Sequence, residues 1–245
     1  MSEAVNLAYQ AIDDDHSDKS AATRRKFVAG AGAALGGMGL LGLSAGAEDA
    51  MAKNDAQTIL NVAASAEVLA TIVNTVGAER VTLDAVTKLN VQAAAREELI
   101  HYKFLRKFGG KPASKRIWIP DAVFASKAGL LNTLVTGDQI FINAYLIGTT
   151  AFAKARSTKF ARFTGEFMGA EAVHRALALQ SLGKLGNDRV FMRYSFTRIE
   201  TAVKQLQKAG FGFGKEGAKP GAFYDFNSVA KRTPDPAGVN TRRPR

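Results

Sequence analysis

Two pairs of carboxylate and imidazole side chains are the residues of this sequence best suited to chemistry. Glu98 and His101 lie three positions apart in REELIHYKFL, and Glu171 and His174 have the same spacing in GAEAVHRAL. Residues three apart on a helix share one face, so each pair would point in one direction. The chain has three histidines, and the third, His16, lies in the N-terminal segment. Every histidine after residue 47 therefore belongs to a Glu-x-x-His pair.

Glutamate and histidine in this combination are typical of a metal site. Carboxylates neutralise and bridge divalent ions, and a neutral imidazole completes the shell of each ion. Both pairs lie in apolar surroundings, where a charged group needs a partner or a metal. Glu67 stands alone in the apolar stretch VAASAEVLATIV, with no neighbouring Lys or Arg. The sequence therefore predicts a buried metal site made from these five residues.

The elements that would position these residues are helices. Apolar residues recur with a 3.6-residue period over 55–75, 83–107, 138–155, 158–182 and 195–208. We expect Gly77 to end the first helix, Thr82 to cap the second, and Ser195 or Thr197 to cap the fifth. The connection IWIPDAVFAS should be irregular or a short helical turn. No alternating strand pattern is present, so the predicted fold class is an all-α helical bundle.

The order of these residues along the chain resembles a known family. In the ferritin-like di-metal pattern, the first and third helices each carry a Glu, and the second and fourth each carry a Glu-x-x-His; this chain resembles that pattern. More narrowly, the chain is similar to exported bacterial ferritin-like domain proteins related to plant desiccation-associated proteins, through ILNVAASAEVLA, FLRKFGG and INAYLIGTTAFAKA. The resemblance implies a ferritin-like four-helix bundle within residues 54–210, with an extra C-terminal helix. It also implies Fe or Mn, bridging roles for Glu98 and Glu171, and terminal roles for Glu67, His101 and His174.

The third helix departs from the family pattern. No Glu occurs between Glu98 and Glu166, so this helix is expected to lack its carboxylate, and Tyr145 takes the corresponding position. Asp138 lies seven residues earlier, two turns away. Three interpretations stay open: Tyr145 ligates as a phenolate or hydrogen-bonds a ligand; the site holds one metal, or two with one under-coordinated; or the site is a relic whose groups bond only to one another.

Other charged residues are given ordinary surface roles. Glu97 is expected to be solvated or to pair with Arg96 or His101, and Glu166 to lie on the exposed side of its helix or beside a ligand. The net charge is +11, but Lys and Arg are scattered and no nucleic-acid motif is present. We therefore expect no nucleic-acid partner, and weak attraction to an anionic envelope surface instead. The absence of cysteine excludes thiolate chemistry.

The first 47 residues resemble a twin-arginine export signal. Arg24 and Arg25 precede a weakly apolar Gly, Ala and Leu stretch, and Ala47 ends a small-residue cleavage site, with Ala52 as the alternative. This resemblance implies the Tat translocase as a partner and a periplasmic or otherwise extracytoplasmic location, with membrane anchoring if the signal is uncleaved. No later segment is expected to span a membrane.

The C-terminal segment 211–245 is rich in Gly, Pro and Arg. We expect an extended tail that lies on the bundle through Phe223, Tyr224 and Phe226. Two functions stay open. The first is a metal-dependent redox protein that serves stress protection. The second is a non-catalytic envelope or desiccation-protection protein with a degenerate metal site. Whether the protein is an enzyme is left open, no catalytic residue is assigned, and a homo-oligomer is compatible with either function.

Overall fold

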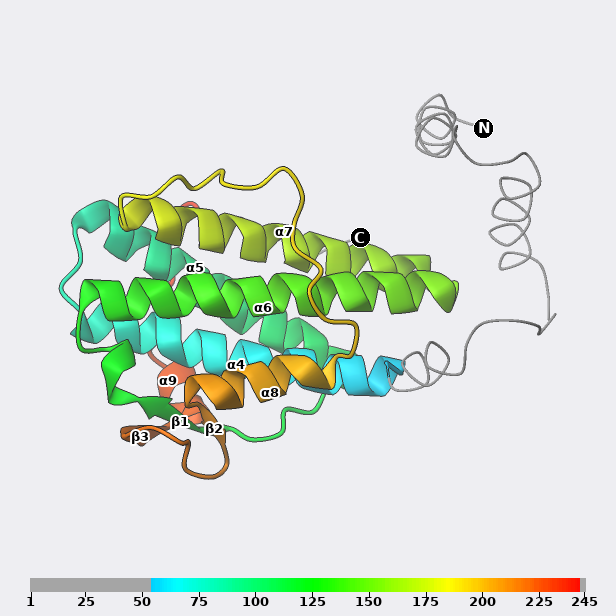
Figure 1. Cartoon of the computed structure of the whole chain (residues 1–245), viewed down its shortest axis with the longest axis horizontal. Coiled ribbons are helices and arrows are strands. Elements are labelled where there is room, and N and C mark those ends of the chain that lie inside the picture. Colours follow the sequence, from blue (N-terminus) through cyan, green and yellow to red (C-terminus); the bar gives the residue numbers. More distant parts are fainter. Residues whose placement is uncertain (1–53, 243–245) are drawn as a thin grey trace. The chain divides into compact units, whose positions relative to one another are not determined.

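The computed structural model describes residues 54–242, which are mostly helical (Figure 1). The helices are α4 (Ala56–Arg80), α5 (Ala85–Lys107), α6 (Lys127–Lys154), α7 (Thr158–Ser181), α8 (Glu200–Ala209) and α9 (Phe226–Ala230), with the 3-10 turn η1 (Asp121–Val123). The strands are β1 (Arg116–Pro120), β2 (Gly212–Phe213) and β3 (Gly221–Asp225). The expected export signal, with Arg24, Arg25, Ala47 and Ala52, lies outside the described residues.

The four long helices pack in pairs. Helix α4 lies against α5 and α6 against α7, while α4 also contacts α6 and α5 contacts α7. Each pair is antiparallel, and the connection 108–126 runs back along the length of the helices, so α5 and α6 point the same way (Figure 1). All four helices contribute to one apolar core. Side chains from all four helices therefore meet in this core.

Short polar side chains set where these helices begin. Asp84, rather than Thr82, caps α5, because its carboxylate accepts hydrogen bonds from the backbone N–H and the hydroxyl of Thr87. Helix α6 begins at Lys127 rather than at residue 138, since the hydroxyl of Ser126 accepts a hydrogen bond from the N–H of Gly129. The earlier start of α6 matters for the site, because it places Asp138 inside the helix.

Gly77 does not end the first helix, which continues to Arg80. A Cβ atom added at Gly77 would lie 2.6 Å from Cδ1 of Leu130, a fully buried residue of α6. The glycine is thus explained by close contact between α4 and α6, and the expected terminator role is wrong.

The expectation of a helical protein is confirmed, but the small three-stranded sheet was not expected. Strand β1 lies in the centre of the sheet and pairs antiparallel with β2 on one side and β3 on the other. Ile117 and Ile119 of β1 are buried in the core. The strands come from segments expected to be irregular: the connection before α6 and the C-terminal tail. The tail is therefore ordered over 212–230, and Phe226 does pack on the bundle, with its ring 4.5 Å from that of Tyr102.

Helix α8 begins at Glu200, five residues later than expected from its apolar pattern. Asn143 of α6 holds the segment before this helix. Its side-chain amide donates to the carbonyl of Phe196 and accepts from the backbone N–H groups of Ser195 and Phe196. Neither Ser195 nor Thr197 acts as the cap, because α8 has no side-chain cap.

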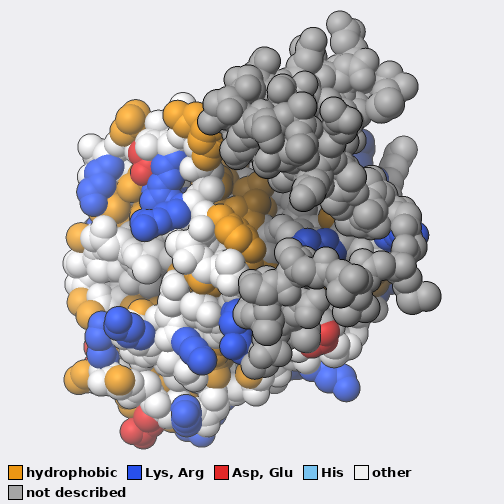
Figure 2. Space-filling model, turned by 45° about the vertical axis from the view of Figure 1, so that its right-hand side comes forward, with side chains coloured by type: hydrophobic (Ala, Val, Ile, Leu, Met, Phe, Trp, Pro, Cys, Tyr) orange, Lys and Arg blue, Asp and Glu red, His pale blue; other side chains and the backbone are white. Residues whose placement is uncertain are grey.

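Helix α4 has the length and hydropathy of a membrane-spanning segment, contrary to the expectation for the chain after residue 47. Its most apolar window is 89% buried inside the protein, however, which is the environment of a core helix. On the face drawn in Figure 2, Lys and Arg side chains are scattered among uncharged ones, as expected from their positions in the sequence.

Candidate metal centre

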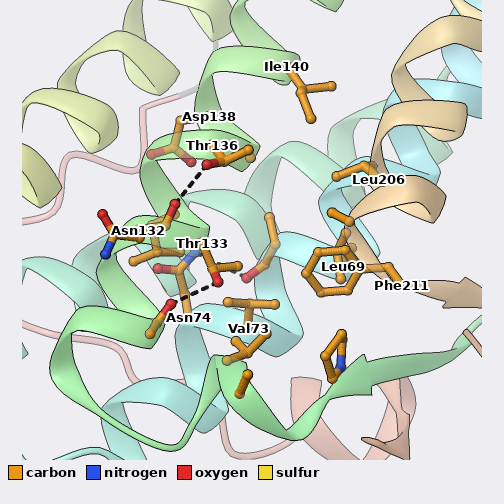
Figure 3. A pocket seen from close by; sticks show the side chains of 18 of the residues that line it. Leu69, Val73, Asn74, Asn132, Thr133, Thr136, Asp138, Ile140, Leu206 and Phe211 are labelled. Carbon is orange, nitrogen blue, oxygen red and sulfur yellow. Dashed lines mark hydrogen bonds between the residues drawn. The ribbon is translucent and has the colours of Figure 1, made fainter. Parts of the chain in front are cut away.

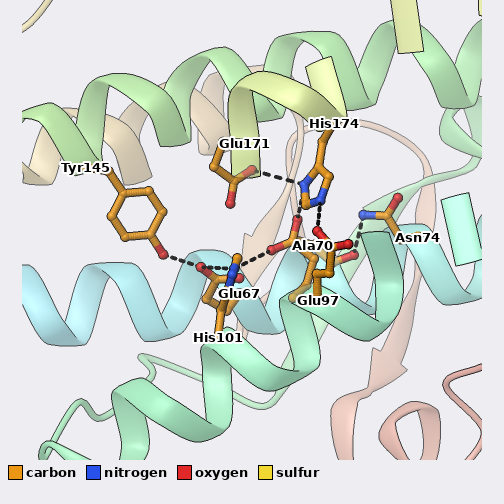
Figure 4. Close-up of polar contacts among 9 residues, drawn as sticks. Glu67, Ala70, Asn74, Glu97, His101, Tyr145, Glu171 and His174 are labelled. Carbon is orange, nitrogen blue, oxygen red and sulfur yellow. Dashed lines mark hydrogen bonds and ion pairs between the residues drawn. The ribbon is translucent and has the colours of Figure 1, made fainter. Parts of the chain in front are cut away.

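The five predicted side chains converge at the centre of the helix packing (Figure 4). Glu67 comes from α4, Glu98 and His101 from α5, and Glu171 and His174 from α7. All three glutamates are fully buried, with 0% exposure. The Glu-x-x-His spacing therefore does place each carboxylate and its imidazole on one inward face. Their role as metal ligands stays a prediction.

The cluster divides into two overlapping groups of four. Glu67, Glu98, His101 and Glu171 form the first group, and Glu98, Asp138, Glu171 and His174 form the second. In each group, ligand atoms lie within 4.8 Å of one another. Glu98 and Glu171 belong to both groups, so these two carboxylates lie between the two positions where an ion would bind.

Asp138 supplies the carboxylate that the third helix was expected to lack. It is 3% exposed and lies on the inner face of α6. The expectation was wrong for two reasons: the carboxylate is an aspartate two turns before Tyr145, and α6 begins well before residue 138. Because α6 starts at Lys127, Asp138 lies in mid-helix and reaches the second group.

Tyr145 donates a hydrogen bond from its hydroxyl to Oε1 of Glu67. Of the roles left open for this residue, the structure thus shows contact with a candidate ligand. Burial and the negative charge of Glu67 raise the pKa of the Tyr145 phenol well above its ordinary value, which favours the donor form. Burial and the neighbouring Glu98 likewise raise the pKa of Glu67.

His174 has carboxylate oxygens near both ring nitrogens, but only Nε2 is hydrogen-bonded. Nδ1 lies 3.2 Å from Oε1 of Glu98 and 3.6 Å from Oε2 of Glu171, while Nε2 lies 2.8 Å from Oε2 of Glu97. Burial lowers the pKa of His174, but its contacts with Glu171, Glu97 and Glu98 outweigh burial and raise it well above the ordinary value. The assignment of Glu97 to solvent, Arg96 or His101 was wrong. Its place one residue before Glu98 was the only signal in the sequence.

His101 lies where the cluster meets a surface pocket. Its Nδ1 is 3.5 Å from Oε2 of Glu98 and 3.7 Å from Oε1 of Glu67, and its ring stacks on Phe167 at 4.2 Å. The pocket has a volume of about 550 Å³, and Phe104, Phe163 and Phe167 form part of its wall. Small molecules from solvent therefore have a route to the His101 side of the cluster. Glu166 pairs with Arg162 on the exposed side of α7, as expected.

The four buried carboxyl groups of the cluster outnumber its two imidazoles. Burial, together with the charge of Glu98, raises the pKa of Glu171 to about 7. Burial and Glu171 raise the pKa of Asp138 well above its ordinary value. Burial also opposes ionisation of Glu98, but contacts with His101 and His174 lower the pKa of Glu98 below its ordinary value. Raised pKa values mean that most of these carboxyl groups hold protons more strongly than usual in the metal-free protein, and a bound cation would displace those protons.

Buried polar atoms without hydrogen-bond partners are concentrated in the same place. Within residues 54–242 they include both carboxylate oxygens of Glu98 and of Glu171, and Nδ1 of His101 and of His174. Buried polar atoms are usually paired, so such a group needs an explanation. Ligands of one ion are at most about 4.2 Å apart when each bond is about 2.1 Å long. The ligand atoms of each group lie within 4.8 Å of one another, so modest side-chain shifts would bring each group within reach of a metal ion.

Comparison of the chain with family models, with curated proteins and with solved structures finds no match in any of the three. The geometry of the cluster is therefore the main observation that bears on function.

Proposed function

We propose that this chain is a ferritin-like protein that binds two Fe or Mn ions in its helical core. The observation that carries the proposal is that Glu98 and Glu171 belong to both four-residue groups. In this arrangement Glu67 and His101 would complete the coordination shell of one ion, and Asp138 and His174 would complete that of the other. Shared carboxylates between two imidazole-bearing positions are the arrangement by which helical bundles hold two carboxylate-bridged ions.

The connectivity of the long helices supports the same proposal. Two antiparallel pairs, α4 with α5 and α6 with α7, are joined by one long crossover, the segment 108–126. A single long crossover is the ferritin-like variant of the four-helix bundle. The Glu-x-x-His pairs lie on the second and fourth helices, and single carboxylates lie on the first and third.

The composition of the site favours Fe or Mn. Carboxylate ligands suit hard ions such as Mn, while imidazole suits Fe, and the cluster offers four carboxylates and two imidazoles. When bound, such ions supply one-electron chemistry toward oxygen or peroxide. The protein would contribute positioning: Glu97 orients His174, and Tyr145 holds Glu67. Stress protection in the cell envelope is the role we propose, with export through the Tat translocase.

The alternative of a degenerate, non-catalytic envelope protein rested on the missing carboxylate of the third helix. Asp138 supplies a carboxylate on this helix, because one of its carboxylate oxygens lies within 4.8 Å of ligand atoms of Glu98, Glu171 and His174. This argument for the alternative therefore no longer holds. We therefore favour the metal-dependent redox protein.

Anaerobic loading with Fe(II), followed by hydrogen peroxide, tests the redox proposal. The protein should consume peroxide and oxidise Fe(II) faster than free Fe(II) does under the same conditions. Glu98→Gln, which removes a carboxylate shared by both groups, should abolish the acceleration, while Glu166→Gln on the surface of α7 should retain it. Equal rates for the protein and free Fe(II) would contradict the proposal.

A further inference from the structure

A second, largely apolar cavity is lined by residues of α4, α6 and α8 (Figure 3), whereas the surface pocket at His101 is lined mainly by residues of α5 and α7. It has a volume of about 320 Å³ and is enclosed by α4, α6, α8 and the β1–η1 segment. Its apolar lining includes Leu69, Val73, Ile140, Phe141, Leu206 and Phe211. The volume is at the lower end of the range for small-molecule sites, which are mostly apolar with a few polar groups.

Gly137 is one of the residues that line this cavity. It lies in the interior of α6, where glycine weakens a helix, and a Cβ atom added there would meet nothing within 4 Å. Gly129, also in the lining, is different, because a Cβ atom there would lie 2.3 Å from the carbonyl oxygen of Ala122. Close packing explains Gly129, whereas no neighbouring atom explains Gly137.

The inner wall of the cavity carries two buried polar side chains with unpaired atoms. Asn74 is 2% exposed and Asp138 is 3% exposed, and Oδ1 of Asn74 and Oδ2 of Asp138 have no hydrogen-bond partner within the described part of the chain. Asp138 is also a member of the second candidate metal group. The cavity therefore ends beside the proposed metal centre.

The positively charged side chain of Lys219 lies at the outer side of the cavity. Lys219 lines the cavity and is exposed, so it marks the mouth. Its backbone is fixed, because Nε1 of Trp118 donates to its carbonyl oxygen at 2.9 Å. The cavity thus combines an apolar interior with a positive charge at its entrance.

We propose that this cavity binds a medium-chain alkyl carboxylate. The alkyl chain lies against the aliphatic and aromatic lining, where it is removed from water, and the carboxylate lies at Lys219. The far end of the chain lies beside Asp138. The inference rests on the proposed function only in bringing that end near a metal ion; binding itself needs no metal.

Isothermal titration calorimetry with decanoate tests the site on full-length protein. Gly137→Leu fills the cavity and should weaken decanoate binding more than tenfold. Gly169→Leu is the matched control, because Gly169 is an exposed residue of α7 outside the cavity and a Cβ atom there also meets nothing within 4 Å. Binding that is absent in the wild type, or equal in both variants and the wild type, would overturn the proposal.

The head group is tested separately. Lys219→Glu should weaken decanoate severalfold and leave decanol unchanged, whereas Lys215→Glu, at an exposed lysine outside the cavity, should change neither. Equal weakening by both variants would show nonspecific charge attraction and overturn the role of Lys219. Metal uptake is measured on the same samples. Decanoate binding without metal uptake would reject the metal centre alone, and metal uptake without decanoate binding would reject the alkyl site alone.

Discussion

Glu97 and His174 contact each other across α5 and α7, with 2.8 Å between Oε2 of the glutamate and Nε2 of the imidazole. The other ring nitrogen, Nδ1, faces Glu98 and Glu171. A carboxylate on the outer nitrogen of a ligating histidine fixes the ring orientation and raises the basicity of the inner nitrogen. Under the proposed function, Glu97 would therefore position His174 for an ion at the second group.

Replacement of this positioning residue should weaken metal binding without abolishing it. We expect Glu97→Gln to lower the affinity for the ion at the second group, which contains His174, about 10- to 100-fold, the usual cost of losing such a partner. Calorimetric titration with Mn(II) measures the two affinities. Glu166→Gln, at a surface carboxylate paired with Arg162, is the control and should match the wild type. An unchanged Mn(II) affinity in Glu97→Gln would show that the contact has no role in binding.

The hydroxyl of Tyr145 should stabilise the metal-free protein. Tyr145→Phe removes the donor to Glu67, a fully buried carboxylate, and should lower the free energy of unfolding by about 1–3 kcal/mol. Tyr194→Phe, at a half-exposed tyrosine, should change it by less than about 0.5 kcal/mol. Urea unfolding of metal-free protein measures both. Metal stoichiometry in Tyr145→Phe should equal that of the wild type, and loss of an ion would instead make the phenol a ligand.

The stability of the metal-free protein should fall as pH rises. Glu171 has its pKa raised from 4.5 to about 7 in the folded state, so the folded protein holds a proton that the unfolded chain releases. Its contribution is complete below pH 4.5 and is lost as pH rises through about 7. The raised pKa of His174 acts in the same direction, above its unfolded value. The lowered pKa of Glu98 acts oppositely, because its contribution is lost as pH falls below 4.5.

Urea unfolding between pH 4.5 and 8 measures this dependence. Glu171→Gln, which cannot ionise, should flatten the decline. Bound metal should reverse the slope, since ligands must lose their protons to bind. Metal-free stability that rises across this range would contradict the account of the buried charges.

Two glycines in long helices should respond oppositely to alanine. At Gly77 the added methyl group would approach buried Leu130 closely, so Gly77→Ala should lower the free energy of unfolding by about 1–3 kcal/mol. At Gly137 the methyl group meets nothing, so Gly137→Ala should raise it by up to about 1 kcal/mol through helix propensity. Thermal unfolding ranks the two variants, and the reverse order would contradict the described packing of α4 against α6.

Periodic patterns in the sequence were enough to predict the four long helices and the convergence of five site residues. Apolar spacing and Glu-x-x-His spacing are local properties that a helix converts directly into a shared face. The sheet could not be predicted in this way, because β1 is short and its partners lie about a hundred residues further along the chain. Its stability depends on tertiary contacts, which local propensity does not report.

Asp138 and Glu97 show why the site itself was only partly predicted. The sequence places both Asp138 and Tyr145 on the third helix, but which of them reaches the candidate metal centre depends on how α6 lies against α4. In the structure Tyr145 lies at Glu67, and Asp138 lies two turns away at the second group. Glu97 was indistinguishable from a solvated glutamate, because its partner His174 is distant in sequence.

Metal content tests the central claim most directly. Protein reconstituted with Fe(II) or Mn(II), desalted, and measured by elemental analysis should hold about two equivalents, as the two four-residue groups require. Asp138→Asn should hold about one, because it changes only the second group. Less than about a tenth of an equivalent in the wild type, with no uptake on reconstitution, would contradict a metal centre, since such sites usually hold their ions tightly.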